Sequence, residues 1–124
     1  MSAEVLAERH FPAERTSPAE ARRFVAECLL SAGEDFGEAL VVAVSELVTN
    51  AVLHAASACR VEVCIDGSGV RVSVQDADPR LPEPRARAPR RVDGRGLLIV
   101  ESLSDRWGVT PVPGGKVVWF ELDR

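Results

Sequence analysis

The stretch from Leu40 to Ala56, LVVAVSELVTNAVLHAA, constrains the fold more than any other part of the chain. Its apolar residues recur at intervals of three and four, which predicts a helix with one buried face. The predicted inward residues are Leu40, Val44, Leu47, Val48, Ala51 and Ala55. On another face Glu46, Asn50 and His54 lie four residues apart, so they should form one polar column. Apolar side chains flank this column, which favours the wall of a pocket over a plainly solvated surface.

A second helix is predicted before it, from Ser17 to about Ser31. Ser17-Pro18-Ala19-Glu20 has the pattern of a capping box, with Ser17 as the N-cap. Gly33 is placed to end this helix, and Asp35 then repeats the capping pattern at the start of the central one. Two amphipathic helices therefore follow each other closely.

Alternating residues predict two β-hairpins. Arg60–Ile65 and Val70–Val74 alternate apolar and polar side chains around Asp-Gly-Ser-Gly. Trp107–Val112 and Lys116–Leu122 repeat this arrangement around Pro-Gly-Gly, and Val5–Phe11 has a weaker strand pattern. Helices on one face of a mixed, mostly antiparallel sheet define a two-layer α/β sandwich.

Composition limits the classes of function. The length of 124 residues suits a single domain, residues 1–124, and the net charge of −4 gives no argument for nucleic-acid or membrane binding. The longest apolar run, Ala39–Val44, is too short to span a bilayer. The three cysteines, Cys28, Cys59 and Cys64, include no CxxC pair, so reduced thiols in a cytoplasmic protein are expected rather than a zinc site.

Two further features could carry chemistry with the polar column. Asp76 follows the second strand of the first hairpin. From about residue 78 to 94, four prolines break regular structure and five arginines make the segment basic. Such a segment is typically a lid, a binding loop or disorder. Gly94-Arg95-Gly96 then leads into a third predicted helix that begins near Leu97.

Each feature also has a purely structural interpretation. Glu46 and Asn50 fit a solvated helix stripe, and Asp76 fits a strand terminator. The Gly-Arg-Gly tripeptide alone is weak evidence, because it also suits a hinge at a helix entry. His54 near a helix C-terminus suits a structural role that favours the helix dipole.

A functional interpretation joins the features into one site. Glycines at a helix N-terminus let backbone N–H groups approach phosphate oxygens, and an arginine adds a charge-assisted contact. An asparagine oxygen together with phosphates can hold Mg²⁺. A carboxylate one helical turn away can act as a general base, and a buried aspartate can accept a hydrogen bond from the amine of adenine.

The motifs resemble those of a known superfamily. SELVTNAVLHA looks like the N-box of the GHKL ATPases, which share the Bergerat ATP-binding fold, while VQDADPRLP and GRGLLIVESLSDRWG look like their G1 and G2 boxes. The resemblance covers essentially the whole chain. It is strongest to small stand-alone serine/threonine kinases of the anti-sigma-factor type, whose last hairpin is similar to WGVTPVPGGKVVWFEL.

The resemblance implies a role for each matching residue. It implies that Glu46 is the general base, that Asn50 helps to hold Mg²⁺, and that Asp76 reads the adenine amine. The ATP-binding residues would further include Arg80 in the lid and Gly94, Arg95, Gly96 and Leu97 beside the phosphates. Lys116 falls near where the last hairpin of the family approaches the nucleotide.

The same resemblance implies cofactors and partners. It implies ATP and Mg²⁺, an anti-sigma-factor antagonist with a STAS domain as the phosphorylated partner, a sequestered sigma factor, and a homodimer as one assembly to test. No phosphoacceptor-histidine helix pair precedes the domain, which counts against a complete two-component histidine kinase.

One departure from the family pattern keeps a second function open. The usual G1 box is Asp-x-Gly-x-Gly, whereas this chain has Asp76-Ala77-Asp78-Pro79-Arg80, so both glycines are missing. The alternative is therefore a module of the same fold that binds a partner and transfers no phosphate. A third interpretation, in which the arginine segment contacts nucleic acid, is disfavoured because the segment has no stacking aromatic residue and the chain is acidic.

Overall fold

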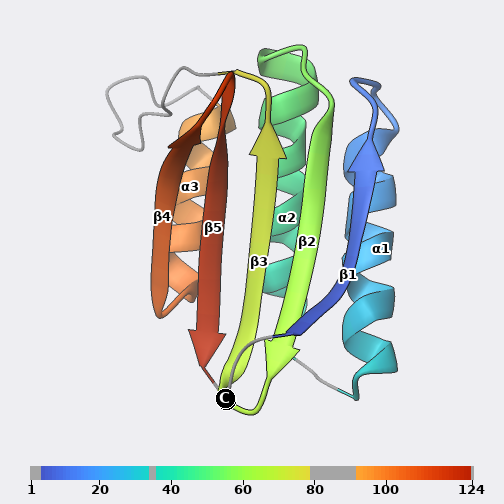
Figure 1. Ribbon diagram of the computed structural model, residues 1–124, viewed down its shortest axis with the longest axis vertical. Helices are drawn as coiled ribbons and strands as arrows, with labels where there is room; N and C mark the ends of the chain where they lie inside the picture. The colour runs from blue at the N-terminus through green and yellow to red at the C-terminus, as the bar shows by residue number, and fades with distance from the viewer. Residues whose placement is uncertain (1–3, 34–35, 79–91, 124) are drawn as a thin grey trace.

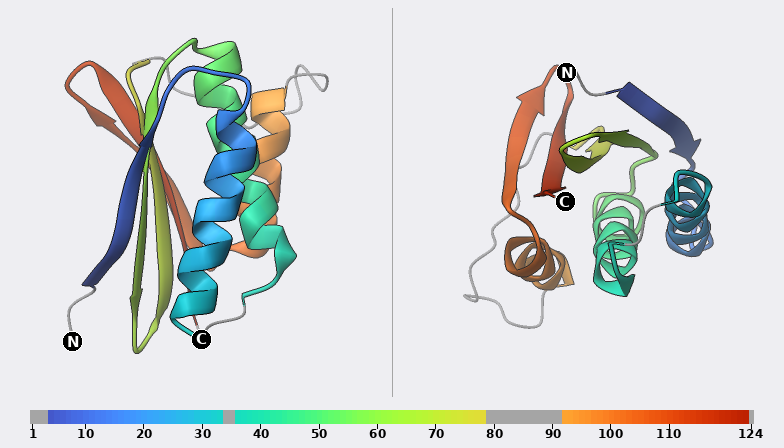
Figure 2. Two further views of the ribbon diagram at one scale, coloured as in Figure 1. Left: turned by 90° about the vertical axis from the view of Figure 1, so that its right-hand side faces the viewer. Right: turned by 90° about the horizontal axis from the view of Figure 1, so that it is seen from below.

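Over the residues that the structure describes, the chain forms one antiparallel sheet with three α-helices packed against a single face (Figure 1; Figure 2). The computed structural model describes residues 4–33, 36–78 and 92–123, and side chains from residue 7 onwards, except those of residues 92–97. The elements are β1 (Glu4–Phe11), α1 (Ser17–Ser31), α2 (Glu38–Thr49), the π-helical turn η1 (Asn50–His54), β2 (Cys59–Asp66), β3 (Gly69–Asp76), α3 (Val92–Leu103), β4 (Arg106–Val112) and β5 (Gly115–Asp123). In this part of the chain, no helix is long and apolar enough to cross a membrane.

The sheet has the strand order β1-β2-β3-β5-β4. All four pairings between the described strands are antiparallel, so the predicted two-layer sandwich and both predicted hairpins are confirmed. β4 takes the outer edge and β5 turns back beside β3, which brings Lys116 directly opposite Asp76. This pairing joins segments that are forty residues apart in the sequence.

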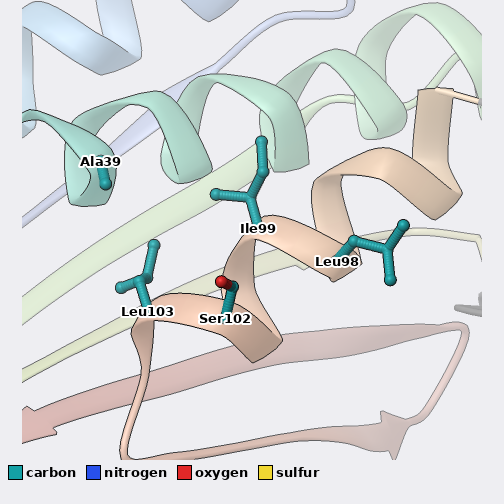
Figure 3. A pocket seen from close by; sticks show the side chains of 5 residues that line it. All are labelled: Ala39, Leu98, Ile99, Ser102 and Leu103. Atoms are coloured by element: carbon teal, nitrogen blue, oxygen red, sulfur yellow. The ribbon is translucent and has the colours of Figure 1, made fainter.

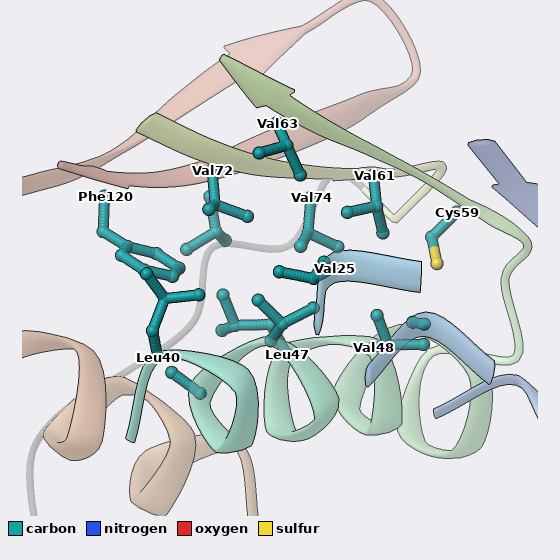
Figure 4. Packing of buried hydrophobic residues seen from close by; sticks show 14 of the residues in the cluster. Val25, Leu40, Leu47, Val48, Cys59, Val61, Val63, Val72, Val74 and Phe120 are labelled. Carbon is teal, nitrogen blue, oxygen red and sulfur yellow. The ribbon is translucent and has the colours of Figure 1, made fainter. Parts of the chain in front are cut away.

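The core lies between the sheet and the helices (Figure 4). Alternate valines of β2 and β3 point inward, as the period of two predicted, and meet the apolar face of α2. The buried residues that Figure 4 labels are Val25, Leu40, Leu47, Val48, Cys59, Val61, Val63, Val72, Val74 and Phe120. Because this core fixes α2 against the end of β3, it also positions the polar groups at that end.

The opposite face of the sheet carries charged side chains. We define the open-face network as Arg71, Arg106, Glu121 and Asp123. Glu121 accepts from Arg71 at 2.9 Å and from Arg106 at 2.7 Å, and Arg106 also pairs with Asp123. The Arg71 guanidinium lies 4.4 Å from the centre of the Trp119 ring. The network lies on the side of the sheet away from the helices and makes this face hydrophilic.

The helix ends differ in part from the predictions. Ser17 is not the N-cap of α1: the cap position belongs to Thr16, and the Ser17 hydroxyl donates 2.7 Å to the carbonyl of Pro12. The buried serine therefore anchors the preceding turn instead of capping the helix. Gly33 follows the end of α1 with a φ of +71°, as predicted for a C-terminal glycine. The predicted capping residue Asp35 lies outside the described residues.

The central helix does not continue as an α-helix to Ala56. The N–H of Asn50 still donates to the carbonyl of Glu46, but the N–H of Ala55 donates to the carbonyl of Asn50, five residues back. A π turn is wider than an α turn, so the positions after Asn50 are rotated. The predicted column therefore ends at Asn50, and His54 is exposed.

Candidate functional site

The candidate residues meet at one end of the sandwich. The π turn after α2, the C-terminal end of β3, the start of α3 and the start of β5 all lie at the upper end of the molecule in Figure 1. Residues from the N-box-like, G1-like and G2-like motifs are thus brought to one region, although α3 and β5 come much later in the sequence. Arg80 and most of the predicted lid lie outside the described residues.

Asn50 is the polar group at this end that most needs a partner. Its Oδ1 atom is buried and, among the described residues, accepts no hydrogen bond. A buried amide oxygen without a partner is costly in a folded protein, so such an atom points to a ligand. Glu46 lies one α-helical turn earlier, and its Oε1 is also shielded from solvent. The helix thus presents a carboxylate and an amide oxygen as neighbours.

Asp76 is held by an ion pair that the sequence reasoning did not predict. Lys116 Nζ lies 3.1 Å from Asp76 Oδ2 and 3.2 Å from Oδ1, and the two side chains are only 9% and 8% exposed. The lysine also donates 3.0 Å to the carbonyl of Asp78. Asp76 is therefore more than a strand terminator, because its carboxylate is buried and paired with a buried cation.

The altered G1 segment has two further ties. The Ser57 hydroxyl accepts a hydrogen bond of 2.9 Å from the N–H of Ala77. The N–H of Ser57 donates a hydrogen bond of 2.9 Å to the carbonyl of Ala51 in the π turn. Gly115 packs so closely that a Cβ there would lie 2.0 Å from the Asp76 carbonyl oxygen. Ser57 and Gly115 were missed because their contacts are set by tertiary structure. The sequence signal for Gly115 was only its turn position.

Cys59 lies beside this site but is chemically quiet. It is the register partner of Asp76 across the β2–β3 ladder. Burial, and then the nearby Asp76 carboxylate, raise the pKa of the Cys59 thiol to about 12. The thiol is therefore protonated at neutral pH and is not a nucleophile or a thiolate ligand. Cys28, Cys59 and Cys64 are all free, in keeping with the expected reduced thiols.

The G2-like glycines lie inside α3 and not before it. The helix begins at Val92, so Gly94-Arg95-Gly96 and Leu97 occupy its first two turns. The prediction of a helix start at this motif is therefore correct within a few residues, and the start of α3 lies at the same end of the molecule as the C-terminal end of α2 (Figure 1). A helix N-terminus offers N–H groups to phosphate oxygens, so these residues remain predicted phosphate contacts.

A separate apolar pocket lies between α2 and α3 (Figure 3). It has a volume of about 260 Å³ and is lined by Ala39, Leu98, Ile99, Ser102 and Leu103. Ala39 lies near the start of α2, whereas Glu46 and Asn50 lie at its end. With four apolar lining residues and one serine, this pocket offers little to bind phosphate or Mg²⁺, so it is not the candidate nucleotide site.

Comparison with known families assigns the chain to a family. Residues 11–122 match the histidine kinase-like ATPase domain, and the chain belongs to this family. The match confirms the expected Bergerat-type α/β fold and the resemblance to GHKL ATPases. ATP is the ligand of the family as its name describes it. Among proteins with curated functions, none matches this chain.

A solved structure has the same fold. It is the crystal structure of the RsbU and RsbW domains of Rv1364c from Mycobacterium tuberculosis, which superimposes with a TM-score of 0.71 at 23% sequence identity. The match covers 95% of this chain but only 33% of that one. The chain therefore corresponds to about a third of the larger protein, and at this identity the similarity establishes the fold.

Proposed function

We propose that this protein binds ATP with Mg²⁺ and phosphorylates a serine or threonine of a protein partner. The observation that carries the proposal is the buried Oδ1 of Asn50, which accepts no hydrogen bond within the described structure and lies one turn after Glu46. Mg²⁺ prefers oxygen ligands and retains water and phosphate oxygens around it, so one amide oxygen suits it. When bound, the ion would neutralise charge on the phosphates.

Glu46 is the proposed general base. In the transfer, its carboxylate accepts the proton of the substrate hydroxyl, the hydroxyl oxygen forms a bond to the γ-phosphorus, and the bond between that phosphorus and the β–γ bridging oxygen breaks to release ADP. Asp76 is the proposed acceptor for the adenine amine. Gly94, Arg95, Gly96 and Leu97 would contact the phosphates from the start of α3, and Arg80 from the lid.

The proposed partners come from the resemblance to anti-sigma-factor kinases and from the structural similarity to a chain with an RsbW domain. We propose a STAS-type anti-sigma-factor antagonist as the phosphorylated protein and a sigma factor as the sequestered one. Both steps belong in the cytoplasm, because they require ATP and the transcription machinery.

Calorimetric titration with ATP, with and without Mg²⁺, tests the metal role of Asn50. The wild-type protein should bind ATP more tightly with Mg²⁺, and Asn50→Ala should lose this Mg²⁺ dependence. Gln75→Ala is the matched control, because it removes an amide whose partner is Arg60 on the open face of the sheet. Equal Mg²⁺ dependence in Asn50→Ala and in wild type would contradict the assignment.

Transfer of labelled phosphate to a serine-bearing STAS protein tests the base. Glu46→Gln should lower the transfer rate by at least about a hundredfold, the range typical of general-base catalysis, while ATP affinity stays within a few-fold. Glu38→Gln, in the exposed first turn of α2, is the control and should retain transfer. A parallel loss of transfer and ATP affinity in Glu46→Gln would remove the base role.

One observation favours the non-catalytic alternative. Asp76 is already paired with Lys116, so part of the acceptor capacity of the proposed base site is occupied before a nucleotide binds, and the G1 glycines of the family pattern are absent. A protein that binds its partner without nucleotide would show no ATP binding up to millimolar concentration. That result would replace the kinase proposal with a partner-binding module of the same fold.

A further inference from the structure

Lys116 is unusual both because it is buried and because of its residue type. It is the only lysine among the fifteen lysine and arginine residues of the chain, and it is 7% exposed. Buried lysines are rare unless they are paired. Its partner Asp76 is the residue proposed to read the base of the nucleotide, which makes the pair a candidate for setting base preference.

The two oxygens of Asp76 are not equally engaged. Oδ1 accepts from the N–H of Asp78 at 2.9 Å and from Lys116 Nζ at 3.2 Å. Oδ2 lies 3.1 Å from Lys116 Nζ as an ion-pair contact, whereas the hydrogen bond of the lysine goes to Oδ1. A carboxylate offers about four lone-pair positions, two on each oxygen. The two hydrogen bonds therefore fill Oδ1 and leave Oδ2 as the oxygen that can still accept.

The register of the sheet makes this arrangement rigid. Asp76 and Lys116 are direct partners in the β3–β5 ladder, and the lysine is tied by a third contact, to the carbonyl of Asp78. Ser57 holds the N–H of Ala77 from the other side, and Gly115 admits the close approach of the two backbones. The carboxylate thus has little freedom to turn its filled oxygen away.

We propose that Lys116 is a specificity-determining residue, which leaves Asp76 a single acceptor and so favours adenine over guanine. The inference rests on the proposed nucleotide binding. Adenine presents one amine on its Watson–Crick edge, beside a ring nitrogen that only accepts. Guanine presents two adjacent donors, the ring N1–H and the 2-amino group, and these need two acceptors side by side. With Oδ1 filled, one guanine donor would be buried without a partner, which is a strong ground for rejection.

The test compares ATP and GTP affinities of wild type and Lys116→Met by calorimetry. Wild type should prefer ATP by at least about tenfold, the size expected of one hydrogen bond to a charged group. Lys116→Met frees an acceptor position on Oδ1, so both oxygens can accept and the preference should fall by about tenfold. Arg60→Met is the matched control: it removes a cation that bonds Gln75, the neighbour of Asp76, on the open face, and should leave the preference unchanged.

The outcomes separate this inference from the proposed function. Failure of wild type to bind ATP removes both. If wild type prefers ATP but Lys116→Met loses affinity for both nucleotides in parallel, the lysine is merely structural and only the inference fails. If Lys116→Met does not fold, the ATP and GTP affinities of the wild-type protein alone test the inference. Equal affinity of the wild-type protein for ATP and GTP would overturn the inference. Undiminished affinity for purine riboside triphosphate, which lacks the 6-amino group, would overturn it as well.

Discussion

Two clusters of opposite charges share β5, and they differ in their access to water. The pair of Lys116 and Asp76 at the start of β5 has side chains that are 9% and 8% exposed. The open-face network at the other end of β5 has side chains that are 27% to 53% exposed. The shorter contacts belong to the exposed network, so geometry alone would rank it as the stronger cluster.

Solvent access reverses that ranking for single substitutions. An exposed charge that loses its partner is hydrated by water, so exposed pairs add little stability. A buried charge that loses its partner has no such substitute, and its removal from water is costly. The buried pair should therefore determine local structure, whereas the open-face network should adjust solubility and the response to pH.

The largest expected effect comes from breaking the buried pair. Lys116→Met leaves the Asp76 carboxylate without its cation and should lower the free energy of unfolding by about 3–5 kcal/mol. Urea denaturation followed by circular dichroism measures the change. Glu121→Gln, which removes a charge of the open-face network, is the comparison and should cost less than about 1 kcal/mol. Equal losses in the two variants would show that solvent access does not separate the clusters.

A smaller effect is expected from the neutral tie beside that pair. Ser57→Ala removes the acceptor of the Ala77 N–H and should lower the free energy of unfolding by about 1 kcal/mol. The same urea experiment measures it, with Ser73→Ala in the middle of β3 as the control. A loss as large as that of Lys116→Met would mean that the hydroxyl, and not the charge, holds the G1 segment.

The smallest effect is a pH dependence of the open-face network. Arg106, and then Arg71, hold the pKa of Glu121 below its usual range. A depressed carboxyl pKa stabilises the fold above the unfolded-state pKa, and this contribution is lost as pH falls through the folded-state value. Between pH 7 and pH 3, wild type should therefore lose more stability than Glu121→Gln, by less than about 1 kcal/mol, and 1 M salt should shrink the difference. An identical acid response in both proteins would contradict the pKa direction.

Local patterns predicted most of the fold. The alternation in residues 60–65 and 70–74 was enough for the β2–β3 hairpin, because its two strands are neighbours in sequence and its turn contains Asp66 and Ser68, which bond each other. The buried face of α2 followed from the helical period. These features depend on interactions within a few residues, which a single sequence displays directly.

The missing features depend on contacts that are distant in sequence. The pairing of Lys116 with Asp76 requires β5 to return beside β3 after α3 and β4, and no local pattern specifies that register. The π turn at Asn50 was missed because a period of 3.6 cannot reveal where a helix widens. The neighbours of Ser17 fit a capping motif, but its hydroxyl donates to the carbonyl of Pro12 instead of capping the helix. The sequence thus identified the candidate site residues, but it did not predict the residues that contact them.

The solitary lysine has a consequence for chemical labelling. All other basic side chains except the two histidines are arginines, so amine-selective acylation can react with only one side chain of this chain. That amine is buried in an ion pair, and acylation requires a free, accessible amine. The rate of modification at Lys116 therefore reports how often β5 and the G1 segment separate. Lys116 is therefore a single side-chain probe of local opening.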